Sequence, residues 1–197
     1  MLAVAAGSEQ LTRAMRSLEA TFLIGVEGVT EIWLIRHADC YEDLADSTDP
    51  PLSKLGVDQA ARLGERLRRT QPAAVYSSPY RRAIETAQAI TGDVRVDERL
   101  VEMKVEVSEE GSLELREPPS GVIERMRAVV DEITHRHAGQ RIAVVGHGAA
   151  IIAYLTDVLR LEPGQLRLLP YYTSISVVRA LGDRRMVGAL GDVAHLE

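Results

Sequence analysis

Two apolar runs in the sequence each lead into a histidine. Residues 31–35 run through Arg36 to His37, and residues 141–145 run through a glycine to His147. An imidazole can act as a nucleophile, and the planar guanidinium beside the first one matches two oxygens of a phosphate group. The pair therefore points to chemistry on a phosphoryl group.

These two runs also predict the sheet that would bring the histidines together. Short, uninterrupted apolar runs are typical of strands buried on both faces in a parallel sheet flanked by helices. The carboxyl ends of such strands share one rim, where ligands bind. We expect an α/β fold with three layers, a mostly parallel central sheet with helices on both faces, and His37 and His147 meeting at that rim.

The other elements follow from periodicity and turn residues. Apolar residues repeat at helical spacing in residues 8–24, 53–70, 80–90, 122–137 and 149–159, with Ser53 as an N-cap. Further strands are predicted at residues 73–76, 94–96, 173–180 and 185–190, and the last two form a hairpin that covers a sheet edge. The Glu-rich segment 103–120 is predicted as a loop that can hold a hairpin.

Length and charge limit the remaining choices. The chain has 197 residues, 46% of them hydrophobic, which suits one domain, so we divide it into an N-terminal amphipathic helical extension, residues 1–29, and a catalytic domain, residues 30–197. A net charge of −6 with scattered basic residues argues against a nucleic-acid or membrane partner. With a lone cysteine, Cys40, and no apolar run long enough to cross a bilayer, we expect a cytoplasmic protein.

The extension carries an apolar stripe. We expect its helix to pack on the domain or on a second subunit, so the stripe allows a homodimer. Its members are Leu11, Met15, Leu18 and Phe22.

An ordered set of short motifs gives the chain a family resemblance. In sequence order these motifs are residues 36–38, 49–56, 77–83, 100–102 and 146–148. Together they resemble the histidine phosphatase superfamily, with its phosphoglycerate mutase-like fold, over roughly residues 30–187. The resemblance implies a metal-independent phosphatase that acts on a small phosphorylated substrate and needs no cofactor.

The resemblance also assigns roles to single residues. It implies that His37 attacks phosphorus and becomes a phosphohistidine, which water then hydrolyses. Arg36 and Arg82 would clamp the phosphate, Arg82 being favoured over its neighbour Arg81 because it directly precedes Ala83. His147 would hydrogen-bond a nonbridging oxygen, and Gly148 would let the backbone come close.

Glu102 matches the family's proton donor to the departing oxygen. Glu98 and Glu106 compete for this role, because the residues that follow Glu102 depart from the family pattern. The sequence leaves this competition open.

Several other activities remain as alternatives. A mutase of this family resembles a longer chain, so the short core favours hydrolysis over phosphoryl transfer between substrates. A phosphohistidine phosphoprotein phosphatase and a phosphate-binding module without turnover are also considered. A cysteine-dependent phosphatase is disfavoured, because it would carry an arginine about six positions after its nucleophile, where this chain has Asp46 after Cys40. No histidine shows metal-ligand spacing.

Overall fold

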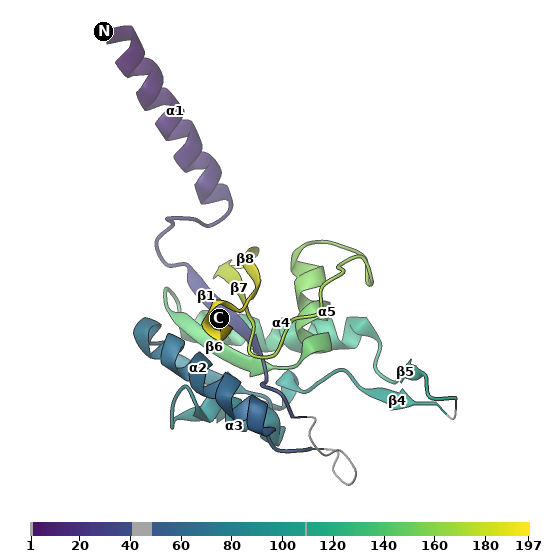
Figure 1. The fold of residues 1–197 in the computed structure, drawn as a ribbon. Coiled ribbons are helices and arrows are strands. Elements are labelled where there is room, and N and C mark those ends of the chain that lie inside the picture. Colours follow the sequence, from purple (N-terminus) through teal and green to yellow (C-terminus); the bar gives the residue numbers. More distant parts are fainter. Residues whose placement is uncertain (1, 41–48, 109) are drawn as a thin grey trace.

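The computed structural model describes residues 2–40, 49–108 and 110–197 (Figure 1). Asp46 lies outside the described residues. Six strands form the central sheet in the order β3-β2-β6-β1-β7-β8. Their bounds are β1 Thr30–Arg36, β2 Ala74–Ser77, β3 Val94–Val96, β6 Arg141–Gly146, β7 Ile175–Leu181 and β8 Arg184–Asp192.

The sheet is mixed but mostly parallel. Strands β3, β2, β6 and β1 run parallel to one another, whereas β7 pairs antiparallel with both β1 and β8. The predicted β7–β8 hairpin is confirmed, and β8 forms one edge of the sheet. The parallel half is the part that sends the ends of β1, β6 and β2 to one rim.

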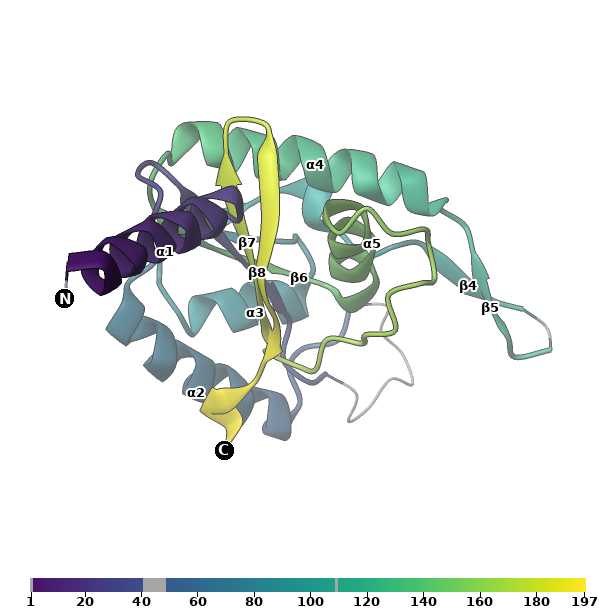
Figure 2. The same ribbon diagram turned by 90° about the horizontal axis from the view of Figure 1, so that it is seen from above.

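Helices cover both faces of the sheet, which confirms the predicted three layers (Figure 2). One face packs against α4 and α5, and the other packs against α2 and α3. In β1, Ile32 and Leu34 belong to the first core, and Ile35 belongs to the second. The helix bounds are α1 Leu2–Thr21, α2 Lys54–Thr70, α3 Arg81–Gln88, α4 Pro119–Arg136 and α5 Gly148–Val158.

The start of α2 lies against the chain just after β1. Ser53 is its N-cap, as predicted, and accepts a hydrogen bond from the Gly56 backbone N–H at 2.9 Å. A Cβ on Gly56 would lie 2.0 Å from the Asp39 carbonyl oxygen, so only glycine permits this approach. The close contact fixes the segment that follows His37.

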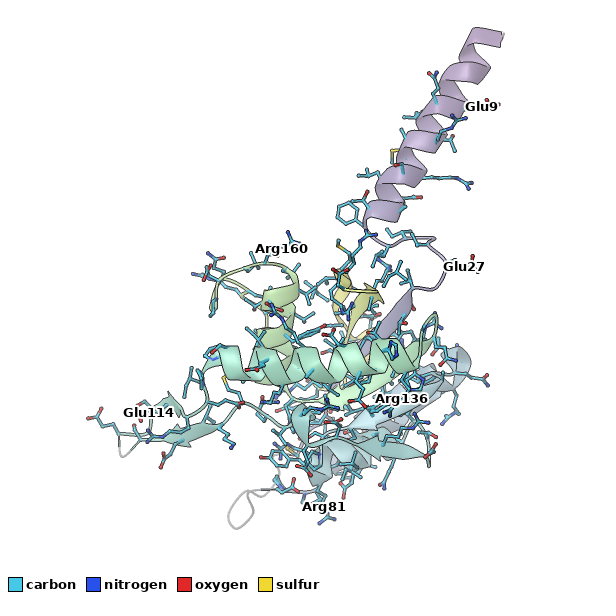
Figure 3. The ribbon with its side chains drawn as sticks, turned by 180° about the vertical axis from the view of Figure 1, so that it is seen from behind. Glu9, Glu27, Arg81, Glu114, Arg136 and Arg160 are labelled. Carbon is cyan, nitrogen blue, oxygen red and sulfur yellow. The ribbon has the colours of Figure 1, made fainter. Side chains whose placement is uncertain are left out.

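Two segments extend from the body of the molecule. The predicted hairpin in the Glu-rich segment is present as β4 (Val105–Val107) paired antiparallel with β5 (Leu113–Leu115) (Figure 2). The N-terminal helix α1 projects away from the body (Figures 1 and 3). Its stripe is exposed, so the expectation that it packs on the domain is wrong; exposure reaches 65% at Leu11 and 51% at Phe22. None of the described helices is both long and apolar enough to cross a membrane.

Candidate active site

The two histidines lie at neighbouring strand ends. Strands β1 and β6 pair in parallel with Arg36 opposite Gly146, so the next residue of each strand is a histidine. The ring centroids of His37 and His147 are 5.2 Å apart. The predicted convergence at the rim is therefore present in the structure.

His37 is held in one tautomer by the backbone. The residue is 2% exposed, and its Nδ1 lies 2.7 Å from the Ala38 carbonyl oxygen. Because a carbonyl only accepts hydrogen bonds, Nδ1 carries the proton and Nε2 keeps a lone pair. Arg82 Nε donates to that atom at 3.3 Å. Burial, followed by the charges of Arg82 and Arg36, lowers the His37 pKa to about 3.

His147 is held in the opposite tautomer by a side chain. Its Nε2 lies 2.8 Å from the Ser78 hydroxyl oxygen, and its Nδ1 lies 3.4 Å from Arg82 Nη2. A guanidinium only donates, so Nδ1 accepts and Nε2–H donates to Ser78. Burial lowers the His147 pKa to about 2, with His37 and Arg82 as further causes. Both rings are therefore neutral at neutral pH, and each turns one lone pair toward Arg82.

Arg82 joins the two histidines from the first turn of α3. Its side chain is only 11% exposed, and Nη1 also lies 3.4 Å from an Asp49 oxygen. The neighbouring Arg81 is directed elsewhere, because its side chain pairs with Glu85 at 2.7 Å and is 60% exposed. The structure thus brings Arg82, and not Arg81, to the histidines.

Arg36 enters the site from the end of β1. Its guanidinium lies 4.1 Å from the centroid of the Tyr172 ring, and Nη1 donates to the Pro170 carbonyl at 2.8 Å. Its Nε is buried and has no hydrogen-bond partner among the described residues. A Cβ on Gly148 would lie 3.5 Å from that nitrogen, so the glycine keeps the space beside it open. A buried donor of this kind calls for an acceptor such as an anion.

Glu102 reaches the amino-terminal end of α5. Its Oε1 accepts hydrogen bonds from the backbone N–H groups of Met103 at 2.8 Å and Ala150 at 2.9 Å. Its Oε2 accepts only from Ala149, at 3.3 Å. The carboxylate is therefore anchored to the helix that begins next to His147.

The two competing glutamates have other surroundings. Glu106 pairs with Arg116 on the β4–β5 hairpin, and Glu98 is an exposed residue of a short 3-10 turn. Of the three candidates, Glu102 is the one that the structure brings to the α5 end.

Four side chains of the site were missed by the sequence analysis. The Tyr80 ring lies 5.1 Å from the His147 ring and 4.7 Å from the Arg82 guanidinium, and the Tyr172 ring lies 6.0 Å from the His37 ring. Ser78, Asp49 and Tyr80 lie within the quoted motifs, which was the available signal. Tyr172 follows an irregular segment with no periodicity, so nothing in the sequence marked it.

The Cys40 thiol lies close to this rim. Burial raises the pKa of the Cys40 thiol, which disfavours the thiolate that a cysteine nucleophile needs. Across residues 2–40, 49–108 and 110–197, no cluster of three or more His, Cys, Asp or Glu side chains could hold a metal ion.

The chain is similar in sequence to proteins of one family. The family model of the histidine phosphatase superfamily (branch 1) matches residues 32–115 and 106–193. A metal-independent phosphoserine phosphatase of Arabidopsis thaliana is 27% identical over 85% of this chain and 84% of its own length. Phosphoglycerate mutase-like protein 4 of the same plant is 29% identical, over 85% of this chain and 87% of its own.

Solved structures share the fold. A phosphoserine phosphatase from Entamoeba histolytica superposes with a TM-score of 0.74 at 20% identity, covering 85% of this chain and all of its own. A mycobacterial glucosyl-3-phosphoglycerate phosphatase gives a TM-score of 0.71 at 22% identity, with 84% of this chain and 100% of its own covered. Residues 1–29 precede the region that the family model matches.

Proposed function

This chain belongs to the histidine phosphatase superfamily, and we propose that it hydrolyses phosphate monoesters through a phosphohistidine intermediate on His37. One observation carries the proposal. The Ala38 carbonyl fixes the proton on Nδ1, so the Nε2 lone pair faces Arg82, 3.3 Å away. A nucleophilic nitrogen is thereby held next to a phosphate-binding cation.

The first half of the reaction places the phosphate among the cations. Arg36, Arg82 and His147 bind the nonbridging oxygens, and the Arg82 Nε–H turns from His37 to the phosphate, which frees the His37 lone pair. His37 Nε2 then forms a bond to phosphorus in line with the ester oxygen, and the bond from phosphorus to that oxygen breaks. Positive groups arranged in advance stabilise the charge that develops on the equatorial oxygens.

The leaving oxygen needs a proton. We assign this proton to Oε2 of Glu102, because Oε2 accepts a single long hydrogen bond whereas Oε1 accepts two shorter ones. In the second half, the same oxygen takes a proton from the attacking water, whose oxygen displaces His37 from phosphorus. Inorganic phosphate and the alcohol are the products.

His147 changes state during this cycle. It is neutral in the empty site because burial lowers its pKa to about 2. A phosphate dianion beside Nδ1 favours the protonated ring, which then donates a hydrogen bond to a nonbridging oxygen. Protonated His147 and the two arginines supply the positive charge, so the proposal includes no metal.

Hydrolysis is preferred to mutase activity. The chain matches relatives named phosphoserine phosphatase and relatives named phosphoglycerate mutase-like. The phosphatases among them support water as the group that accepts the phosphoryl group. We expect no isomerised product when a monophosphoglycerate is supplied together with a bisphosphate, and efficient interconversion would contradict hydrolysis as the main activity.

The activity itself is tested by a substrate screen. A panel of small phosphorylated metabolites is incubated with the wild type and with His37→Ala, and release of inorganic phosphate is measured. We expect release by the wild type alone. Equal release by both proteins would remove His37 from the reaction, and phosphate binding without release would favour the non-catalytic binding module.

We also propose a cytoplasmic location. The single Cys40 is a free, buried thiol, which suits a reducing compartment. We propose a small molecule as the substrate. The net charge is −6 and the basic residues are scattered along the sequence, which does not favour a nucleic acid as the substrate.

A further inference from the structure

An apolar and aromatic strip borders the phosphate site. Leu169 and Tyr171 belong to the irregular segment between α5 and β7, and they are 72% and 54% exposed. Leu169 Cδ1 lies 3.7 Å from the place where a Cβ on Gly148 would be, so it stands beside the start of α5. The Tyr171 ring is 5.6 Å from Tyr172, which continues the strip to Arg36 and His37.

A second aromatic ring borders the other two phosphate-binding residues. Tyr80 contacts His147 and Arg82, just as Tyr172 contacts His37 and Arg36. Each histidine and each arginine of the site therefore has a tyrosine beside it. A group attached to the phosphate meets flat rings and a leucine as it leaves the charged centre.

Three arginines, of α3, of α4 and of the segment after β5, already have carboxylate partners. Arg81 pairs with Glu85, Arg116 pairs with Glu106, and Arg125 pairs with Glu117. A carboxylate on the alcohol part of a substrate would meet the apolar and aromatic strip, where a charged group loses hydration at a large cost.

We infer that the substrate is a small phosphate ester whose alcohol part is uncharged and flat or apolar, with an aryl or arylmethyl group next to the ester oxygen. Leu169, Tyr171 and Tyr172 hold that group, and Tyr80 borders it from the α3 side. This inference rests on the proposed function. It separates this chain from enzymes whose substrate carries its own carboxylate.

The test compares esters with similar primary alkyl leaving groups, so that intrinsic reactivity does not decide the result. Benzyl phosphate, propyl phosphate, phosphoserine and 3-phosphoglycerate are compared by kcat/KM. We expect benzyl phosphate to exceed each of the others by about tenfold or more, as apolar contacts of this size provide. A kcat/KM for phosphoserine or 3-phosphoglycerate that equals or exceeds that for benzyl phosphate would overturn the inference.

Variants assign the preference to the strip. Leu169→Ala should lower kcat/KM for benzyl phosphate several-fold, by roughly the effect of a lost apolar contact, while propyl phosphate is almost unaffected. Leu190→Ala is the matched control, because Leu190 is an exposed leucine of β8. Tyr172→Phe keeps the ring and should keep the preference. Equal losses for all esters in Leu169→Ala would show a structural role instead, and would overturn the inference.

Binding distinguishes this inference from the proposed function. Benzylphosphonate and propylphosphonate cannot be hydrolysed, so their dissociation constants report the strip even if turnover fails. Tighter binding of benzylphosphonate supports the inference, and equal affinities contradict it. If no ester is hydrolysed and His37 is never phosphorylated, the proposed function fails by itself.

Discussion

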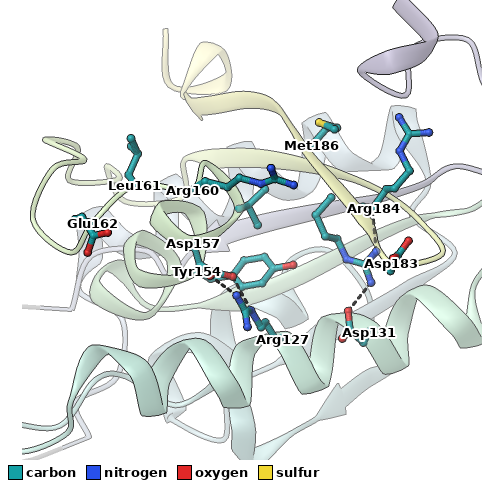
Figure 4. Close-up of a pocket in the computed structure, with 12 residues that line it drawn as sticks. Arg127, Asp131, Tyr154, Asp157, Arg160, Leu161, Glu162, Asp183, Arg184 and Met186 are labelled. Carbon is teal, nitrogen blue, oxygen red and sulfur yellow. Dashed lines mark hydrogen bonds and ion pairs between the residues drawn. The ribbon is translucent and has the colours of Figure 1, made fainter.

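Arginines from other elements lie near both ends of helix α5, but they differ in whether a carboxylate pairs with them. At its amino-terminal end, Arg36 bonds to the Pro170 carbonyl, has no carboxylate partner among the described residues and has a buried nitrogen without an acceptor. At its carboxyl-terminal end lies a pocket of about 670 Å³ (Figure 4), where Arg127 pairs with Asp157 and Arg185 pairs with Asp131. Arg36 therefore has no carboxylate beside it, whereas Arg127 and Arg185 each have one, although Arg185 Nε is buried without a partner as Arg36 Nε is.

The difference shows that arginines alone do not make a phosphate site. The amino-terminal end of a helix is its positive end, which favours anions, and the carboxyl-terminal end is its negative one. At the amino-terminal end of α5, the backbone N–H groups of Ala149 and Ala150 donate to the Glu102 carboxylate. This carboxylate is also the group that we propose as the proton donor. Two neutral imidazoles, the arginines that border them and the Glu102 carboxylate occur together at only one of these ends.

The largest loss is expected from His37→Ala. Without Nε2 no bond to phosphorus can form, and the remaining cations still bind phosphate, so turnover should fall by about 10⁴-fold or more while substrate affinity persists. Phosphate release and equilibrium binding of inorganic phosphate are measured on the same preparation. A variant that keeps more than a tenth of the wild-type rate would exclude His37 as the nucleophile.

Arg82→Ala should cost about a hundredfold or more in kcat/KM, because it removes a charged donor to the transferring phosphoryl group. The matched control is Arg127→Ala at the other end of α5, which also removes one arginine but should leave kcat/KM unchanged. If the two variants lose activity equally, the contrast between the two ends of the helix fails.

Acid sensitivity is the next expected effect. His37 and His147 have pKa values lowered to about 3 and about 2 in the folded chain, and both are near 6.5 when unfolded. The unfolded chain therefore binds more protons below pH 6.5, so stability is lost as pH falls, by about 2 kcal/mol for each histidine between pH 7.5 and 5. Urea unfolding of the wild type, His147→Asn and the exposed-site control His135→Asn measures this. If the free energy of unfolding of His147→Asn fell with decreasing pH as steeply as that of the wild type, the assigned role of His147 in acid sensitivity would be wrong.

The smallest effect is expected from Ser78→Ala. The Ser78 hydroxyl accepts the His147 Nε2–H and so keeps Nδ1 turned toward Arg82. Its loss leaves that N–H unpaired and the ring less fixed, which should lower kcat about tenfold with little change in KM. Ser77→Ala is the control, because the equally buried Ser77 donates to the Ser78 carbonyl instead. Similar losses in both variants would indicate a packing effect.

The sequence predicted the sheet and the meeting of His37 with His147 because their apolar runs are long enough to define buried strands. Arg82 could be preferred to Arg81 from its position, and its contact with both histidines agrees with that preference. These features depend on local pattern and on the parallel order of strands.

Other features depend on contacts that local pattern does not encode. The apolar stripe of α1 shows which face of the helix is apolar but not what packs against that face. The helix begins at Leu2, earlier than the predicted residue 8, because the apolar stripe starts later than the helix does. Tyr172 reaches Arg36 from an irregular segment, and Ser78 selects the His147 tautomer through a single hydroxyl. Only the assembled fold reveals these neighbours.

The most direct measurement is the identification of the phosphorylated residue. The wild type is mixed with a rapidly hydrolysed phosphate monoester, quenched with base to preserve phosphohistidine, digested and mapped by mass spectrometry. We expect phosphate on His37, formed and lost at rates that match turnover. Phosphate on another residue, or steady turnover with no phosphorylated His37 in a quench that preserves phosphohistidine standards, would contradict it.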